Sequence, residues 1–465
     1  MAQEEVRLSE VLAGLSYALD LTEGQRPGHA VRSCAIGTRI AEVLRLPSEQ
    51  RSDLFYALLM KDLGCSSNAS RFAALFAADD HDLKTALSCT NWSKPLESFR
   101  FVAKSVAPGQ SWLRRTWQAL AVFARGPKGA RQVVETRCER GAEIAELIGF
   151  GGDTVQAIRA LDEHWDGRGQ PYSLKRDQIP LLGRILGLAQ TVEVFFSTYG
   201  VLTAYDMAVA RRGTWFDPEL VDALLSIRAD SAFWQWLRDG ETLREIGTVE
   251  PADKVFVADE SRLDAIAGAF AKVIDAKSPW TYEHSNGVAD VAGAMAATLG
   301  FPAAETRELH RTALLHDVGK LGISSLILDK PGKLTEAEFD AVKQHPALTG
   351  QILNRVGCFR PLVAVAAAHH ERLNGSGYHR GLRGDQLTMA TRVLCVADMY
   401  DALRASRPYR RALPMSHARE EIRRCSGSQF DPEVVKVFLS IPEQHWMELR
   451  EHLGSPFRLA HLRNL

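Results

Sequence analysis

Histidine, a residue type that holds transition metals in proteins, is concentrated in one part of the chain. Seven of the 14 histidines lie between positions 284 and 398 of the 465-residue sequence. The pair His316-Asp317 follows the apolar helical pattern ELHRTALL, and the pair His369-His370 follows PLVAVAAA. Successive residues of a helix project about 100° apart, so each pair can offer two ligands to neighbouring ions. We therefore predict a metal site formed by His284, His316, Asp317, His345, His369, His370 and Asp398.

A nitrogen-rich ligand set that includes carboxylates suits two transition metals. Two such ions, roughly 3.5–4 Å apart, can hold a bridging hydroxide and phosphate oxygens for in-line attack on a phosphodiester. We expect Asp317 to bridge the ions and Lys320, three residues later, to stabilise charge that develops on the phosphoryl oxygens. Arg407 and Arg410 are candidates for holding further phosphates. The alternative for these three cations is solvation or a surface ion pair.

Length and composition limit the class of protein. A chain of 465 residues exceeds what one hydrophobic core usually supports, so it predicts two or three domains. No stretch approaches the roughly 18 apolar residues of a membrane span, and the acidic start MAQEEVRLSE does not resemble a secretory signal. Seven scattered cysteines without a CxxC pair predict neither a zinc ribbon nor a disulfide framework. We expect a cytoplasmic protein without a membrane partner.

The overall charge gives no reason to expect a nucleic-acid polymer as partner. The formal net charge is −1, so a general attraction to DNA, RNA or an anionic membrane is absent. An anionic substrate must therefore be attracted by local groups.

The two halves of the chain repeat each other. GHAVRSCAIGTRIAEVLRL matches EHSNGVADVAGAMAATLGF, and LLMKDLGC matches ALLHDVGK. The spacing from His29 to Asp62 and from His284 to Asp317 is 33 residues in both halves. Further on, WDGRGQP, GRILGLAQ and FDPELVDALLSI match LNGSGYH, TRVLCVAD and FDPEVVKVFLSI. Agreement in order, spacing and residue type predicts two homologous domains.

The fold class follows from apolar residues that recur every three or four positions, as in LDAIAGAFAKVI. We predict an all-α protein with two tandem HD-type helical domains at 1–226 and 260–465, joined by a packed linker at 227–259. Asp62 and Arg137 are 75 residues apart, whereas the aligned Asp317 and His345 are 28 apart. The first domain therefore carries 47 extra residues, mostly between about 66 and 128, which we expect to form additional helices.

The second half resembles the HD-GYP phosphodiesterases, a subgroup of the HD metal-dependent phosphohydrolase superfamily. The matching segments are LLHDVGKLGI, LILDKPGKLT, the HP of KQHPALTG, HHERLNGSGYH, RVLCVADMYDAL and RPYRRA. The resemblance implies hydrolysis of a bacterial 3′,5′-cyclic dinucleotide, cyclic di-GMP or 3′,3′-cyclic GMP-AMP, by a metal-bridging hydroxide. It places the metal ligands on the seven residues named above and the substrate phosphates on Lys320, Arg407 and Arg410.

The resemblance also implies the cofactor, which is two divalent transition metal ions, iron or manganese before nickel, cobalt or zinc. Some relatives bind a third ion through a glutamate four residues before the first histidine. That position is Trp280 here, which favours a binuclear centre.

One family motif is altered. Gly377-Tyr378-His379 stands where the family has Gly-Tyr-Pro, so the loop lacks the fixed φ of proline and gains an imidazole. The change removes no predicted metal ligand, but it bears on substrate choice and on docking of a regulatory protein at this loop. Tyr378 is a candidate substrate contact, and its alternative role is to anchor the glycine turn. A homodimer is also left open.

The first half lacks most of the predicted ligands. His29 and Asp62 are retained, whereas the positions of the other ligands are taken by Lys61, Arg137, Leu161, Asp162 and Gln190. Lysine and arginine place permanent positive charge where a metal needs lone pairs. We predict a degenerate domain with a regulatory or a purely structural role.

Two other functions are compatible with these residues. The first is a receptor that binds a cyclic dinucleotide or a protein partner without turnover, which the altered loop and the degenerate half suggest. The second is an HD hydrolase of another nucleotide or of a phosphomonoester. Binding that persists without turnover distinguishes the first, and a substrate panel distinguishes the second.

Overall fold

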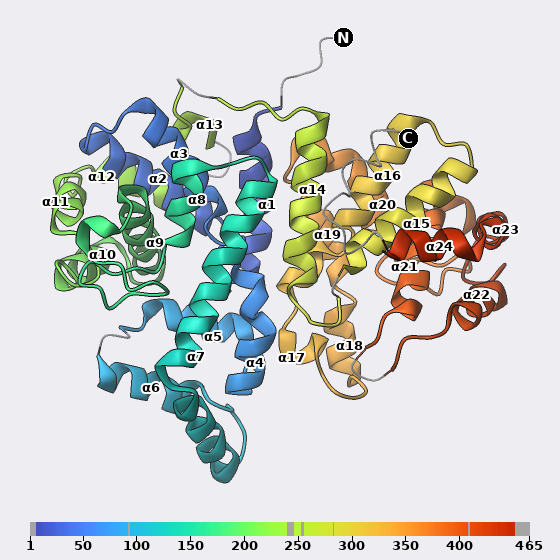
Figure 1. Ribbon diagram of the computed structural model, residues 1–465, viewed down its shortest axis with the longest axis horizontal. Coiled ribbons are helices and arrows are strands. Elements are labelled where there is room, and N and C mark those ends of the chain that lie inside the picture. The colour runs from blue at the N-terminus through green and yellow to red at the C-terminus, as the bar shows by residue number, and fades with distance from the viewer. Residues whose placement is uncertain are drawn as a thin grey trace. The chain divides into compact units, whose positions relative to one another are not determined.

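The computed structural model describes residues 6–91, 94–239, 246–252, 255–281, 283–407 and 410–451. The chain divides into two compact units: unit 1 is Met1–Leu263 with Ser324–Leu326, and unit 2 is Asp264–Ile323 with Ile327–Leu465. Within the described ranges both units are built from helices, and strand pairing is limited to isolated bridges (Figure 1). The predicted all-α fold is confirmed, whereas the domain limits at 226 and 260 stay predictions.

The first part of the chain contains thirteen α-helices and two 3₁₀ turns over its described residues. They are α1 (Leu8–Thr22), α2 (His29–Val43), α3 (Ser48–Met60), η1 (Cys65–Asn68), α4 (Ala69–Phe76), α5 (Asp80–Cys89), α6 (Pro95–Ser105), α7 (Trp112–Leu147), α8 (Gly152–Arg159), η2 (Arg176–Gln178), α9 (Leu181–Tyr199), α10 (Val201–Ala210), α11 (Pro218–Ser226), α12 (Ser231–Asp239) and α13 (Ile246–Val249).

The rest of the chain is equally helical. Its elements are α14 (Glu260–Asp275), α15 (His284–Thr298), α16 (Ala303–Leu315), η4 (Val318–Gly322), α17 (Ser325–Leu328), α18 (Glu336–Val342), α19 (His345–Leu353), η5 (Gly357–Leu362), α20 (Val363–Ala366), η6 (Gly384–Gln386), α21 (Met389–Arg404), α22 (Met415–Arg424), α23 (Pro432–Ser440) and α24 (Glu443–Glu451). In the part of the chain that the structure describes, no helix has both the length and the apolar character needed to cross a bilayer.

In each unit a central helix begins with a histidine of the repeat, His29 in unit 1 and His284 in unit 2. In unit 2, α15 begins at His284 and packs against α16 and α21. Its inward side chains Val288, Ala292 and Met295 are fully buried and follow the spacing of an amphipathic helix. In unit 1, α2 begins at His29 and packs in the same way against α3 and α9. The repeat in the sequence is therefore also a repeat in packing.

The FDPE segments show the same repeat at the level of single hydrogen bonds. Asp217 caps the N-terminus of α11 and accepts from Arg184 Nη1 at 2.7 Å. Asp431 caps α23 and accepts from Arg392 Nη1 at 2.6 Å. Aspartate at this position satisfies backbone N–H groups that the first turn of a helix leaves unpaired. Corresponding helices thus start from the same ion-paired cap in both units.

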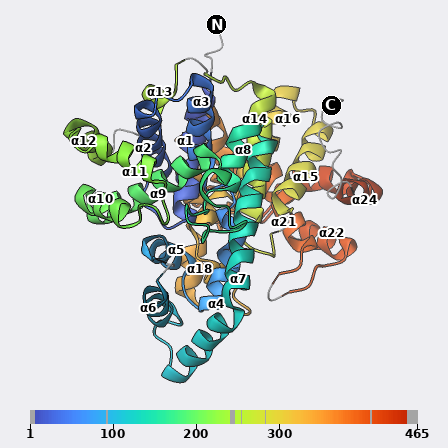
Figure 2. The ribbon, with the colours of Figure 1, turned by 60° about the vertical axis from the view of Figure 1, so that its left-hand side comes forward.

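The predicted extra helices of the first half are confirmed as α4, α5, α6 and the start of α7, which gather at one end of unit 1 in both views (Figures 1 and 2). They share a small core of their own around Phe76, Leu83, Phe101 and Val102. The long helix α7 is interrupted at Gly126, whose φ of 55° is not helical. Its first part therefore belongs to the insertion, and its second part packs on α8 and η1.

A close approach between η4 and α19 fixes the turn that contains His316 and Asp317. A Cβ atom on Gly319 would overlap the carbonyl oxygen of His345, so glycine is required there. Thr349 Oγ1 accepts from Gly319 N at 3.0 Å and donates to His316 O at 2.8 Å. The turn is therefore held against the helix that carries His345.

We expect Gly319→Ala to destabilise unit 2 by about 1–3 kcal/mol, the usual cost of overfilling a packed interior. Gly293 on α15 is the matched control, because an added Cβ there meets nothing within 4 Å. Gly293→Ala should stabilise its helix by up to about 1 kcal/mol. Chemical unfolding of both variants measures the difference, and equal stabilities would contradict the close approach described above.

Candidate metal centre

The seven predicted ligands come from five separate segments of unit 2. His284 and His345 are the first residues of α15 and α19, and Asp398 lies within α21. The pairs His316-Asp317 and His369-His370 lie in the turns that follow α16 and α20. All are buried except His370, which is partly exposed.

The expectation that each pair projects from a helix is wrong in this detail, because α16 ends at Leu315 and α20 ends at Ala366. The physical reason is that the histidines help to end these helices. His316 Nδ1 contacts Ala313 O at 2.7 Å, and His369 Nδ1 contacts Ala366 O at 2.6 Å, so each ring satisfies a carbonyl of the last turn.

The carboxylate of Asp317 lies at the centre of the cluster and faces two sets of imidazoles. Its Oδ1 is 3.3 Å from His345 Nε2 and 3.6 Å from His369 Nε2. Its Oδ2 is 3.6 Å from His284 Nε2 and 3.4 Å from His316 Nε2. Each oxygen therefore points to a different group of nitrogens, as expected of a carboxylate that bridges two cations.

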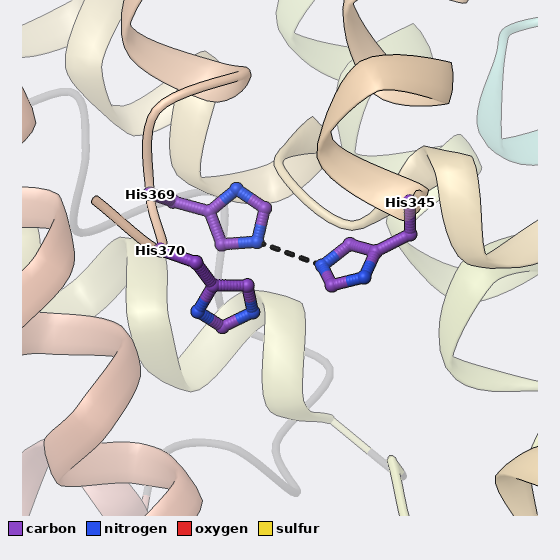
Figure 3. A group of neighbouring side chains, drawn as sticks. All are labelled: His345, His369 and His370. Atoms are coloured by element: carbon purple, nitrogen blue, oxygen red, sulfur yellow. Dashed lines mark hydrogen bonds between the residues drawn. The ribbon is translucent and has the colours of Figure 1, made fainter. Parts of the chain in front are cut away.

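The two groups are each compact enough to hold one ion. The ligand atoms of His345, His369 and His370 lie within 4.8 Å of one another, and the three rings converge in Figure 3. The same limit holds for His284, His316 and Asp398. Asp398 also extends towards the first group, because its Oδ2 is 3.6 Å from His370 Nδ1.

Hydrogen bonds at the far side of the rings determine which nitrogen can bind metal. A carbonyl oxygen can only accept, so His316, His345 and His369 must carry their proton on Nδ1, where they face Ala313, Val342 and Ala366. The Nε2 lone pairs are then directed at Asp317 and at each other. This outer ring of carbonyls orients three ligands.

The electrostatics of the cluster favour neutral imidazoles at His345, His369 and His370 beside an ionised Asp317. Burial lowers the pKa of His345 and of His370 to about 3 and that of His369 well below its usual value. Burial alone would raise the pKa of Asp317, but the Lys320 ammonium and His316 lower it well below its usual value. At these three histidines and at Asp317, the favoured protonation states are those that metal binding requires. His284 differs, because burial alone would lower its pKa but Asp317, Asp398 and Asp401 raise it well above its usual value.

The cluster also contains polar atoms that the protein does not satisfy. His284 Nε2, His316 Nε2 and Asp317 Oδ1 are buried and lack a hydrogen-bond partner among the described residues. An unsatisfied buried polar group costs about 1–3 kcal/mol, so such atoms usually have a partner. Coordination to a cation would satisfy all three, and the residues present therefore fit a pair of metal ions.

The four predicted substrate contacts differ in whether they touch the cluster of candidate ligands. Lys320 lies in η4 and its ammonium contacts Asp317 Oδ2, while Tyr378 has its ring centroid 4.8 Å from that of His370. Arg407 donates to Trp280 O at 3.3 Å. Arg410 donates to Ala402 O at 2.7 Å and to Leu403 O at 3.0 Å, so its guanidinium caps the end of α21. The phosphate-binding role of these side chains stays a prediction.

Sequence reasoning missed the outer carboxylate Asp401. Its Oδ2 lies 2.7 Å from His284 Nδ1, and a Cβ on Gly287 would overlap its carboxylate, so the glycine makes room for it. A signal was available, because Asp401 follows Asp398 by three residues on one helix face, and Glu193 occupies the aligned position in the first half.

In unit 1 a lysine ammonium lies at the position that corresponds to the candidate metal centre of unit 2. The Lys61 ammonium contacts Asp62 and lies 2.8 Å from His29 Nε2, and His29 Nδ1 contacts Glu193. Arg32, aligned with Gly287, donates to Glu193 Oε1 at 2.7 Å. The buried acceptors are thus already satisfied by protein groups.

A further group in unit 1, formed by Glu23, Asp62 and Cys65, is close enough to hold an ion. However, Lys84 Nζ lies 2.8 Å from Glu23 Oε1, and burial raises the pKa of the Cys65 thiol well above its usual value. A thiol that stays protonated and a carboxylate paired with lysine are poor ligands.

Comparisons with known proteins cover both halves. The HD domain family model matches residues 128–220 and 268–434. The 3′3′-cGAMP-specific phosphodiesterase 3 of Vibrio cholerae is 41% identical over 434 residues, 93% of this chain and 94% of that protein. A cyclic di-GMP phosphodiesterase of Thermotoga maritima is 38% identical over 168 residues, 35% of this chain and 45% of that protein.

A solved structure covers nearly the whole chain. The crystal structure of a cyclic GMP-AMP specific phosphodiesterase of V. cholerae matches 95% of this chain and 100% of its own, with 36% identity and a TM-score of 0.65. The chain belongs to the HD domain family, and its predicted relationship to the HD-GYP phosphodiesterases is confirmed. Membership of this family implies dependence on divalent metal ions.

We expect Asp317→Ala to remove bound metal, because both groups of imidazoles lose their shared oxygen ligand. Asp62→Ala is the matched control in unit 1 and should leave the metal content unchanged. That control should still lower stability, by about 3–5 kcal/mol, because it removes the carboxylate beside the buried Lys61. Elemental analysis of anaerobically purified protein measures the metal, and equal loss from both variants would contradict a metal centre confined to unit 2.

Asp401→Leu should weaken metal binding by roughly 10–100-fold, the usual effect of losing an outer partner of a ligating histidine. Asp401→Asn should retain most of the affinity, because its amide oxygen still accepts from His284 Nδ1. Competition with a chromophoric chelator gives both affinities. An unchanged affinity in the leucine variant would show that Asp401 does not orient His284.

Proposed function

We propose that the chain is a metal-dependent phosphodiesterase that hydrolyses a 3′,5′-cyclic dinucleotide, with 3′,3′-cyclic GMP-AMP as the preferred substrate. The observation that carries the proposal is the placement of Asp317, whose two oxygens face separate groups of histidines. The similarity to cyclic dinucleotide phosphodiesterases supports the substrate class. Similarity to a cyclic GMP-AMP specific relative over 93% of the chain, including the degenerate half, supports the preference.

The proposed cofactor is a pair of divalent ions, one held by His284, His316 and Asp398 and one by His345, His369 and His370, with Asp317 shared. Iron or manganese suits this set, because it combines imidazoles with carboxylates and contains no thiolate. Such a pair supplies a nucleophile at neutral pH by lowering the pKa of bound water, and it polarises a phosphoryl oxygen.

The surrounding residues would bind and orient the substrate. Lys320 is 17% exposed at its side chain and contacts Asp317, so its ammonium lies beside the centre and can stabilise negative charge on a phosphoryl group. Tyr378 lies against His370 and offers an aromatic face to a base. We propose both as substrate contacts.

We also propose a cytoplasmic location, which seven free cysteines support. The homodimer and a regulatory partner at the Gly377-Tyr378-His379 loop stay predictions. For unit 1 we propose a structural or regulatory role without catalysis, because Lys61 and Arg137 replace two of the histidines.

The test is turnover of 3′,3′-cyclic GMP-AMP and cyclic di-GMP by protein loaded with iron, manganese or nickel, with products resolved by chromatography. We expect faster turnover of the GMP-AMP substrate and a loss in Asp317→Asn that exceeds the roughly 10–100-fold effect of an outer-shell change. Faster turnover of cyclic di-GMP would overturn the preference only. If both substrates stay intact with all three metals, the proposed enzymatic activity is refuted. Tight binding without turnover would instead identify a receptor.

A further inference from the structure

The insertion of unit 1 exposes an unusual number of large apolar side chains. Trp112 and Trp117 on the first part of α7 are 74% and 75% exposed. Leu113, Leu120 and Phe123 on the same helix are also exposed, and so are Leu96 and Phe99 on α6. Soluble proteins rarely leave such a cluster in water, so it indicates an interaction surface.

Three of these side chains, Leu113, Trp117 and Leu120, lie on the outer side of a helix whose inner side is already packed. Ala119 and Val122 contact the small core of the insertion around Phe101. Leu113, Trp117 and Leu120 follow each other at intervals of four and three residues, so they form a separate stripe along the helix. We call this stripe, with Trp112 and Phe123 beside it, the outer stripe. Leu113, Trp117 and Leu120 lie outside the small core of the insertion, whereas the ring of Phe123 stacks on that of Phe99 with the ring centroids 6.0 Å apart.

The outer stripe is embedded in strong positive charge. Residues 94–131 contain eight lysines and arginines and one glutamate, a formal net charge of +7, whereas the whole chain has a net charge of −1. Within the described residues only Lys94 of these eight pairs with a carboxylate, that of Glu97. Arg114 and Arg125 are exposed on the flank of the stripe. The local positive charge therefore favours binding of an anionic partner.

We propose that α6 and the first part of α7 form a docking surface for a bilayer that contains anionic phospholipids. Tryptophan, leucine and phenylalanine on one face would enter the boundary between headgroups and acyl chains, while the flanking cations contact lipid phosphates. A second copy of the chain fits less well, because it would bring two surfaces of charge +7 together. Binding at such a surface needs no membrane-spanning helix.

The test uses the full-length chain and sedimentation with vesicles of phosphatidylcholine alone or mixed with phosphatidylglycerol. We expect binding only to the anionic vesicles, weakened at high salt and accompanied by a blue shift of tryptophan fluorescence. Each cation near the surface contributes about fivefold to the partition constant. Arg114→Glu with Arg125→Glu, and separately Trp112→Ser with Trp117→Ser, should each reduce it at least tenfold.

Leu202→Ser is the matched control, because Leu202 is 64% exposed on α10, outside the basic segment. It should leave vesicle binding unchanged, and none of these variants should alter the melting temperature or turnover of soluble substrate. The proposal is overturned by an absence of binding to anionic vesicles or by equal binding to neutral ones. A wild-type dimer that the tryptophan variant dissociates, without vesicle binding, would assign the surface to a second copy. Binding of an oligonucleotide in place of vesicles would assign it to nucleic acid.

Discussion

The structure of unit 2 depends on one buried carboxylate that must face two sets of imidazoles. Asp317 is 1% exposed, and its oxygens lie 3.3–3.6 Å from four Nε2 atoms. A charge in this position is costly unless a cation compensates it. Several features of the fold bring the imidazoles to this carboxylate. Helix α16 ends before His316, and Gly319 allows η4 to approach α19 closely. His284 and His345 are the first residues of their helices.

Unit 1 shows that the scaffold requires positive charge at this point and can obtain it without a metal. The ammonium of Lys61 contacts Asp62 and lies 2.8 Å from His29 Nε2, so a side chain provides what an ion would provide in unit 2. Arg32 replaces a glycine and binds Glu193, the counterpart of Asp401. The exchange keeps the helices packed around the same pair of histidine and aspartate. It also removes the open coordination positions that hydrolysis needs.

The sequence allowed the repeat, the helical fold and the set of candidate ligands to be predicted, because these depend on order, spacing and residue type. It did not allow the local geometry to be predicted. His316-Asp317 was expected at the end of a helix, but α16 ends at Leu315 and the ring of His316 bonds a carbonyl of the last turn, a contact that spacing alone does not reveal. The hydrogen bonds from the Arg410 guanidinium to carbonyls at the end of α21 were likewise not foreseen, while its phosphate-binding role stays a prediction. Such uses of a side chain depend on where a helix ends, and periodicity locates helix ends poorly.

The altered loop differs from the family motif at one backbone position while the scaffold around it is shared by both units. Glu371 accepts from Arg380 N at 2.7 Å and from Leu382 N at 3.0 Å, and Glu163 makes the corresponding bonds in unit 1, so a buried carboxylate holds each loop. His379 has φ near 150°, a value that the ring of proline forbids. The residue therefore changes the backbone at one position inside a loop whose ends are fixed. Burial lowers the pKa of His379, which favours the neutral form of the imidazole that the substitution adds.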